Sequence, residues 1–167
     1  MIKLIIPAEP YLKSYTQAYD AYAQLCVSTY GMTDPRSCDI FEKYDSYRQE
    51  RNLKPNRVGA DYYWLVDDRR DYFIGEITIR HRLTDDLFLR GGHIGYVIRS
   101  EEWGKGYGTL MLKLALEKAR DLGLEKVLIT CNDDNLASAR VMEKNGCILE
   151  NILEVNGRPV RRYWRSL

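Results

Sequence analysis

A run of glycines after a strand-like segment carries the strongest chemical signal in this chain. Gly104, Gly106 and Gly108 lie between a β-branched and aromatic run at residues 93–99 and a long amphipathic segment. Alternating glycines at a strand-to-helix junction leave backbone N–H groups uncovered, and these groups point outward at the positive end of the helix. Such a cluster can hold a diphosphate, so we expect the N–H groups of residues 104–109 to bind a nucleotide-type cofactor.

Two common phosphate loops fit this segment poorly. A Walker loop needs Gly-Lys followed by Ser or Thr, whereas Lys105 is followed by Gly106. A dinucleotide fingerprint needs GxGxxG and an acidic residue about 20 positions later, after a strand. Here the third glycine comes one residue early, and Asp121 lies inside a predicted helix. A nucleotide-binding enzyme of another fold is therefore kept as an alternative, which competition by ATP or NAD would support.

The pattern that matches is x-x-Gly-x-Gly after a strand, as in the GNAT superfamily of N-acetyltransferases. The segment from Gly95 to Gly108 resembles in particular the branch that acetylates ribosomal-protein N-termini. Residues 135–146 resemble the second signature of that branch, an Asn-x-x-Ser helix closing on Glu-Lys-x-Gly. The resemblance covers roughly residues 60–165 and implies an acetyl-CoA-dependent N-acetyltransferase.

The resemblance also implies a set of cofactor contacts. In the family, the fourth strand pairs through its backbone with the pantetheine arm, and a backbone N–H near Val97 or Ile98 would face the thioester oxygen as an oxyanion donor. Asn135 would contact the pantetheine amide, and Ser138 would do likewise. The expected cofactor-binding residues are Tyr96, Val97, Ile98, Gly104, Lys105, Gly106, Tyr107, Gly108, Thr109, Asn135 and Ser138.

Three side chains are candidates for the catalytic base. An amine acceptor with a pKa of about 8 or 10 must lose a proton before it attacks, and histidine has the most useful intrinsic pKa for that task. His93 opens the strand that would carry the thioester, although its place in the strand alternation counts against it. His81 ends the preceding strand and could lie beside His93 across the hairpin. Glu76 is mid-strand and could instead face solvent, and a water chain is the fourth route.

The proton donor is a departure from the family pattern. Many members carry a tyrosine seven residues beyond the asparagine, where this chain has Met142, and a thioether cannot donate a proton. Either water protonates the departing thiolate, or Tyr163 or Tyr107 replaces the missing tyrosine. No cysteine sits beside a base, so direct attack without an acyl-enzyme is expected. A non-catalytic module that senses acetyl-CoA remains the alternative function.

Bulk properties narrow the remaining classes. With 167 residues the chain is expected to form a single N-acetyltransferase domain over residues 1–167. Its 25 Lys+Arg and 24 Asp+Glu balance, so no nucleic-acid partner is expected, and the arginines at 158–165 are interpreted as a solvated strand face. No apolar run reaches membrane-spanning length and no signal peptide is evident, which predicts a cytoplasmic protein with reduced cysteines. No metal is expected, the partner is a small-molecule or peptide amine, and a homodimer is left open.

The elements that must position these residues follow from hydrophobic periodicity and turn signals. Their predicted order, β-α-α-β-β-β-α-β-α-β-β, indicates an α/β chain with a mixed, mostly antiparallel sheet, which suits the GNAT fold. Strands are expected at 3–6, 62–66, 72–79, 93–99, 126–131, 147–155 and 158–164; helices at 9–30, 39–51, 109–122 and between 135 and 145; and a loop or helical turn at 84–90.

Overall fold

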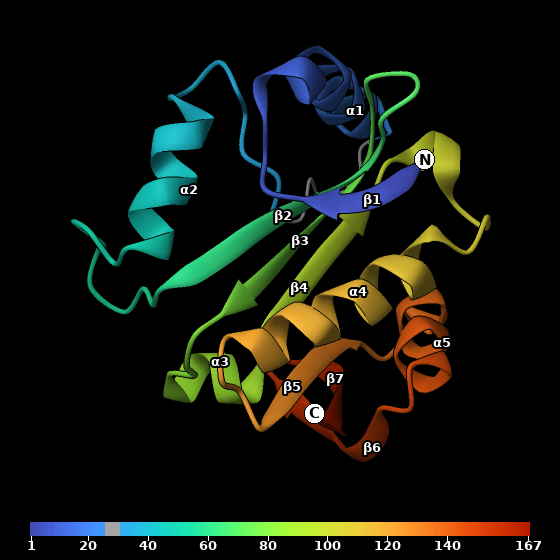
Figure 1. The fold of residues 1–167 in the computed structure, drawn as a ribbon. Helices are drawn as coiled ribbons and strands as arrows, with labels where there is room; N and C mark the ends of the chain where they lie inside the picture. Colours follow the sequence, from blue (N-terminus) through green and yellow to red (C-terminus); the bar gives the residue numbers. More distant parts are fainter. Residues whose placement is uncertain (26–30) are drawn as a thin grey trace.

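One twisted sheet carries the fold, with helices packed on its two faces (Figure 1). The computed structural model describes residues 1–25 and 31–167. The strands are β1 (Ile2–Ile5), β2 (Ala60–Asp67), β3 (Tyr72–Arg80), β4 (Ile94–Ile98), β5 (Lys126–Asn132), β6 (Ile148–Val155) and β7 (Arg158–Ser166). The α-helices are α1 (Leu12–Gln24), α2 (Ile40–Arg48), α3 (Asp85–Leu89), α4 (Tyr107–Asp121) and α5 (Leu136–Lys144), and short 3₁₀ turns cover Glu9–Tyr11 and Ser100–Glu102.

The described strands form a seven-stranded sheet in the order β1-β2-β3-β4-β5-β7-β6. All neighbouring strands are antiparallel except β4 and β5, which are parallel. A parallel pair needs a long crossover, and α4 supplies it between these two strands. The expected α/β fold with a mixed, mostly antiparallel sheet is confirmed.

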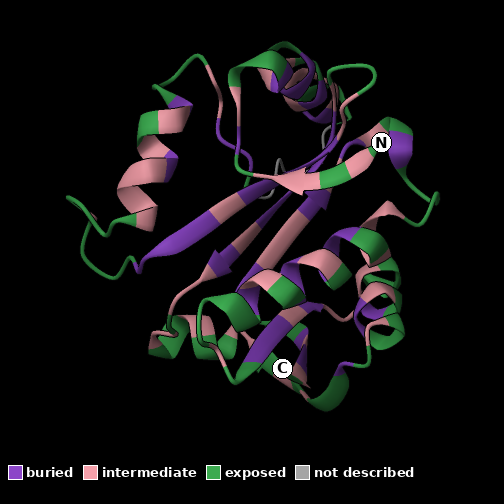
Figure 2. Ribbon diagram, viewed as in Figure 1, coloured by how far each residue is buried: buried purple, intermediate pink, exposed green. Residues whose placement is uncertain are grey.

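Side-chain alternation along the central strands builds two hydrophobic cores, one on each face. On β2, Tyr63 and Leu65 pack with side chains of α4 and α5, whereas Trp64 and Val66 pack with side chains of α1 and α2. Figure 2 shows the resulting run of buried residues along the middle strands. Because successive side chains point to opposite faces, a strand buried on both sides reads as an unbroken apolar run.

The first two helices are shorter than the sequence predicts. The segment at 9–30 begins with a 3₁₀ turn, and its α-helical part ends at Gln24; the predicted end at Tyr30 lies outside the described residues. Asp39 caps α2 by accepting hydrogen bonds from the Phe41 and Glu42 N–H groups at 3.0 and 3.1 Å. Glu50 then adopts a φ of 53°, which cannot continue a right-handed helix.

The interpretation of the C-terminal arginines as a solvated face is wrong for Arg162. This side chain is only 2% exposed, and its Nη1 donates to Glu150 at 2.6 Å. The cause is topological, because β7 lies between β5 and β6 and half of its side chains therefore face inward. As for the membrane, the described helices include none with the length and apolarity that a transmembrane span requires.

Candidate active site

A fork opens between the two parallel strands. In the described residues β4 is in register with β5 only where Ile94 faces Ile129, preceded by a single bridge from Gly92. Beyond Ile94, β4 pairs with β3 alone, while β5 continues along β7. The second half of β4 therefore presents a free backbone edge to the space between the strands.

The alternation of hydrogen bonds decides which peptide groups face this fork. Arg80 N–H donates to the His93 carbonyl at 2.7 Å, which fixes the bonded pairs between β3 and β4. Bonded and non-bonded pairs alternate in an antiparallel ladder. The peptide groups of Tyr96 and Ile98 consequently point into the fork, and those of Val97 point toward β3. For the oxyanion donor, this geometry favours the Ile98 N–H over the Val97 N–H.

Two aromatic side chains donate hydrogen bonds to the Ile98 carbonyl at the end of that edge. The Trp103 indole Nε1 donates to the Ile98 oxygen at 2.7 Å, and the Tyr22 hydroxyl donates to the same oxygen. The two rings meet edge to face with centroids 5.9 Å apart. Sequence reasoning missed this contact, because Tyr22 comes from α1, 76 residues before Ile98.

The glycine segment forms the entry to α4. Gly104 and Gly106 have φ values of 77° and 85°, and a Cβ on either would meet nothing within 4 Å, so glycine is needed there for the backbone alone. At Gly108 a Cβ would lie 3.2 Å from Val141 Cγ2, so this glycine allows α4 to approach α5. No described side chain caps α4. The N–H groups of residues 107–109 are therefore available to an anion.

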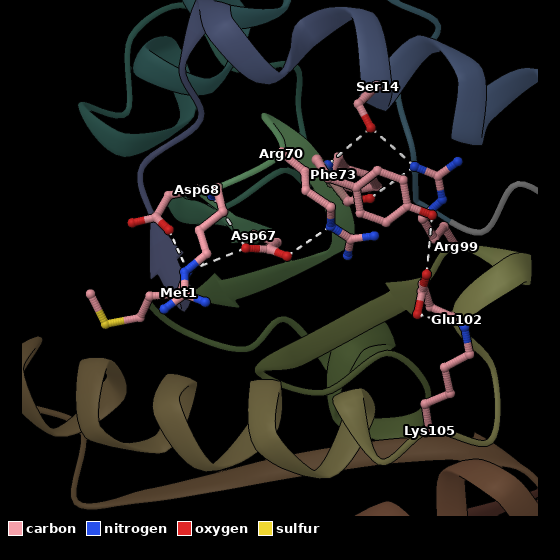
Figure 3. Close-up of polar contacts among 11 residues, drawn as sticks. Met1, Ser14, Asp67, Asp68, Arg70, Phe73, Arg99, Glu102 and Lys105 are labelled. Carbon is pink, nitrogen blue, oxygen red and sulfur yellow. Dashed lines mark hydrogen bonds and ion pairs between the residues drawn. The ribbon is translucent and has the colours of Figure 1, made fainter.

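A buried polar network holds this segment against the sheet (Figure 3). The Arg99 guanidinium donates to Ser14 Oγ at 3.0 Å and lies 4.1 Å from the centre of the Tyr72 ring. The Tyr72 hydroxyl donates to Glu102 Oε1 at 3.1 Å, and Lys105 Nζ pairs with Glu102 Oε2 at 3.0 Å. Lys105, an expected cofactor contact, is thus held by a carboxylate within its own loop.

Tyr96 links the fork to α5. Its hydroxyl lies 2.7 Å from Ser138 Oγ, and Asn135 Oδ1 accepts a hydrogen bond from the Ser138 N–H at 3.1 Å as the N-cap of α5. Burial raises the pKa of Tyr96, so the phenol stays protonated. The structure therefore brings together Tyr96, Asn135 and Ser138, which the resemblance implied for one cofactor.

Glu76 is a buried carboxyl group on the face covered by α1 and α2. It is 2% exposed, so the solvent-facing alternative for this residue is wrong. Its Oε2 accepts hydrogen bonds from the Tyr44 hydroxyl at 2.6 Å and from the Trp64 Nε1 at 2.8 Å. Burial raises the pKa of Glu76 to about 7, against the lowering effect of these two donors. In register, Glu76 faces Val97.

His93 is buried and holds the two parallel strands together. Its Nδ1 accepts a hydrogen bond from the Leu128 N–H of β5 at 2.9 Å. Burial, followed by the nearby charge of Arg80, lowers the pKa of His93 to about 4. The ring is therefore neutral at pH 7, with one nitrogen already used in the fold.

His81 does not pair with His93, so the two histidines do not face each other across the β3–β4 pair. The backbone of Arg80, not that of His81, pairs with His93, and the His81 N–H donates to the Gly59 carbonyl at 2.9 Å. The His81 ring turns toward β2, where Nε2 lies 2.7 Å from Asp61 Oδ2. The three candidate bases consequently do not form one cluster.

The candidate proton donors are also placed by the structure. Met142 is fully buried in the core. The buried Tyr163 donates its hydroxyl proton to Glu143 Oε1 at 2.9 Å, while Tyr107 is half-buried at the start of α4. Burial raises the pKa of Cys131 to about 11, which disfavours a thiolate nucleophile. The described part of the chain contains no group of three His, Cys, Asp or Glu side chains able to hold a metal ion.

Known proteins share both this sequence pattern and this fold. A family model described as acetyltransferase (GNAT) domain matches residues 12–148. Acetyltransferase Pat of Mycolicibacterium smegmatis is 22% identical over 118 residues, which cover 65% of the chain and 34% of that protein. The chain therefore spans about a third of the length of this curated relative.

Two solved structures illustrate the shared fold. The microcin C7 self-immunity acetyltransferase MccE, in complex with acetyl-CoA and AMP, has a TM-score of 0.71 and 18% identity over 99% of this chain and 92% of that one. A ribosomal-protein-S5-alanine acetyltransferase from Vibrio fischeri has a TM-score of 0.70 and 17% identity over the same shares, 99% and 92%. The resemblance seen in the sequence is confirmed, and a ribosomal-protein acetyltransferase is among the proteins of this fold.

Proposed function

Since the chain belongs to the acetyltransferase (GNAT) domain family, we propose that residues 1–167 act as one acetyl-CoA-dependent N-acetyltransferase domain. The acceptor is a primary amine of a small molecule or a protein N-terminus. The observation that carries the proposal is the open edge of β4, which leads directly to the uncapped start of α4. That arrangement offers main-chain donors to an extended amide chain and to a diphosphate in a continuous line.

The chain's own groups divide the work of holding acetyl-CoA. The N–H groups of residues 104–109 bind the diphosphate, and the peptide groups of Tyr96 bind the pantetheine arm. The Ile98 carbonyl is engaged by Trp103 and Tyr22, so Ile98 contributes its N–H alone, at the thioester end of the arm. Asn135 Oδ1 is committed to capping α5, which leaves its Nδ2 to donate to a pantetheine carbonyl. The Glu102 carboxylate holds the Lys105 side chain beside the loop, within reach of a bound diphosphate.

Glu76 is the base that the geometry supports best. Both hydrogen bonds to its carboxylate use Oε2, so no described group occupies Oε1. A pKa near 7 lets the ionised group accept a proton from an ammonium with a pKa of about 8 to 10. His93 is less suited because its pKa is too low, and His81 because Asp61 engages its ring.

The proposed reaction is a direct transfer. The ammonium loses a proton to Glu76, and the free amine nitrogen attacks the thioester carbon. The Ile98 N–H stabilises the carbonyl oxygen while negative charge develops on it. The C–S bond then breaks, the acetyl group stays on the nitrogen, and the second proton that the nitrogen loses passes through water to the departing thiolate. Tyr96 is a weak donor for that last step because burial raises its pKa.

A binding and turnover experiment tests this function. The purified chain is titrated with acetyl-CoA by calorimetry, then incubated with a panel of peptide N-termini, polyamines, amino sugars and amino acids while thiol release and acetylated product are measured. Micromolar binding with acetylated product supports the proposal. Binding without product on any acceptor would favour the sensor alternative, and displacement by ATP or NAD but not by coenzyme A would favour a different nucleotide site.

A further inference from the structure

A pocket of about 400 Å³ lies between α2, the segment 55–58, β3 and the start of α3. Its lining includes two tyrosines, two arginines, a threonine of β3 and one aspartate: Tyr47, Tyr62, Arg57, Arg80, Thr78 and Asp86. No residue assigned above to acetyl-CoA belongs to this lining. The pocket is therefore separate from the proposed acetyl-CoA site, and its side chains indicate which acceptor could bind there.

The pocket adjoins the proposed base. Glu76, Thr78 and Arg80 alternate along β3, so their side chains share one face of the sheet. Tyr62, which faces Thr78 in register, stacks on Tyr44 with ring centroids 4.1 Å apart and an interplanar angle of 8°. Tyr44 in turn donates to Glu76. Tyr62, which lines the pocket, is thus connected through Tyr44 to the carboxylate proposed to take the amine proton.

Arg80 brings a half-buried positive charge to the pocket without a matching carboxylate. Its Nη1 donates to the carbonyls of Gly91 and Gly92 at 3.2 and 2.9 Å, which are neutral partners. Throughout residues 1–25 and 31–167, no carboxylate forms an ion pair with it. A methyl group on Gly95 would lie 3.6 Å from Nη2, so the guanidinium lies over Gly95 of β4. A charge that is partly withdrawn from water is stabilised by an opposite charge, so Arg80 is suited to bind an anion that enters the pocket.

Arg57 strengthens the preference for a negative group. It is exposed at the pocket, and within the described ranges it has no ion-pair partner. Its charge lies near enough to lower the pKa of Arg80, after the larger effect of burial. Asp86, the one acidic lining residue, would repel a second negative charge. The pocket therefore suits a group with a single negative charge, such as a carboxylate, better than a phosphate.

We propose that this pocket binds the carboxylate of the amine acceptor, which makes the acceptor a small amino carboxylic acid. This inference rests on the proposed acetyl transfer. Arg80 and Arg57 bind the carboxylate, and the rings of Tyr47 and Tyr62 contact the body of the molecule. Because Arg80 reaches over Gly95, a carboxylate bound there leaves the amine of the same molecule near the fork.

Acetylation of matched substrates tests the inference. Each standard L-amino acid is compared with its C-terminal amide, which keeps the amine and removes the negative charge. For the best substrate we expect the acid to exceed its amide in kcat/KM by about tenfold or more, as for a charge-assisted contact. Arg57→Gln should raise KM for the acid by about tenfold and leave the amide unchanged. Lys54→Gln is the matched control, because Lys54 is exposed in the same segment outside the pocket lining.

Equal kcat/KM values for acid and amide, or an equal loss on both in Arg57→Gln, would overturn the inference while leaving acetyl transfer intact. Calorimetric titration of the amino acids onto the chain provides a readout that needs no turnover. Carboxylate binding that depends on Arg57, without any acetylated product, would support the pocket and reject the proposed function. Arg57 is chosen over Arg80 because Arg80 also bonds two backbone carbonyls, so its loss would disturb the fold.

Discussion

Glu76 and Val97 face each other directly across the β3–β4 pair, and both side chains are buried on the face covered by α1 and α2. The residues on either side of Val97 turn their peptide groups into the fork. Neighbouring strands lie about 4.8 Å apart, so the candidate base stands one strand away from the backbone that would hold the thioester. The relationship explains how one side chain on β3 can serve a reaction on β4.

Replacing Glu76 with Gln should abolish proton removal with little change in shape. We expect kcat to fall by about a hundredfold or more, within the usual range for loss of a general base, and the Kd for acetyl-CoA to stay within about twofold. Steady-state kinetics and calorimetry check the two values. A near-normal kcat in this variant would show that water or His93, and not Glu76, acts as the base.

Replacing Tyr44 with Phe should move the pH profile. The Tyr44 hydroxyl lowers the pKa of Glu76, so removing this donor should raise that pKa further above 7. The rising limb of kcat against pH should therefore shift to higher pH. Tyr19→Phe is the control, since no hydrogen bond links Tyr19 to Glu76 in the described structure. An unchanged limb would show that Glu76 does not set the profile.

The stability of the Glu76→Gln variant should depend on pH with a definite sign. Burial raises the pKa of Glu76 from 4.5 to about 7, so the folded chain favours the protonated form. The contribution of the protonated Glu76 carboxyl to the free energy of unfolding is fully present below pH 4.5. It is lost as the pH rises through 7, and the loss amounts to at most about 3 kcal/mol. The variant should therefore gain stability relative to the original chain between pH 5 and pH 8. Thermal or urea unfolding at pH 5 and at pH 8 measures the free energy of unfolding of both proteins. A difference between them that does not change with pH would contradict the prediction.

Replacing Gly106 with Ala should separate backbone strain from ligand binding. A side chain at a φ of 85° costs about 1 kcal/mol of stability, and the added Cβ should displace the N–H groups that we propose bind the diphosphate. We expect the Kd for acetyl-CoA to rise by about tenfold or more.

Gly157→Ala is the matched control for that change. Gly157 has a φ of 73°, and a Cβ there would likewise meet nothing within 4 Å, but it lies in the turn between β6 and β7. It should cost similar stability and leave the Kd unchanged. Equal effects of the two variants on binding would reject a phosphate role for the glycine segment.

Replacing His93 with Gln should affect stability more than catalysis. The pKa of His93 falls from 6.5 to about 4 in the folded chain, so its contribution is present above pH 6.5 and is lost as the pH falls through 4. The original chain should lose up to about 3 kcal/mol over this window, and the variant should lose less. Unfolding at pH 7.5 and pH 5 measures the effect. A large loss of kcat at pH 8 in a folded variant would instead favour His93 as the base.

Local sequence signals predicted most of the fold. Some features depend only on neighbouring residues and can be recognised from the sequence alone. They are the glycines between β4 and α4, the Asn135 cap of α5 and the apolar run of β5. Boundaries shifted where a capping or positive-φ residue acted, as at Asp39 and Glu50. The catalytic side chains were harder to rank, because their burial and partners come from distant segments.

By itself, the sequence determined the order of elements, the glycine-rich entry to α4 and the family, because these follow from residue spacing along the chain. Only the tertiary structure decided that Glu76 is buried with a raised pKa and that the rings of His93 and His81 have different partners. It likewise decided that Arg80 has no carboxylate partner in the described chain. The physical reason is that protonation and pairing depend on solvent exclusion and on groups that meet through space. Tyr44 and Glu76, 32 residues apart, form one hydrogen bond that no local pattern encodes.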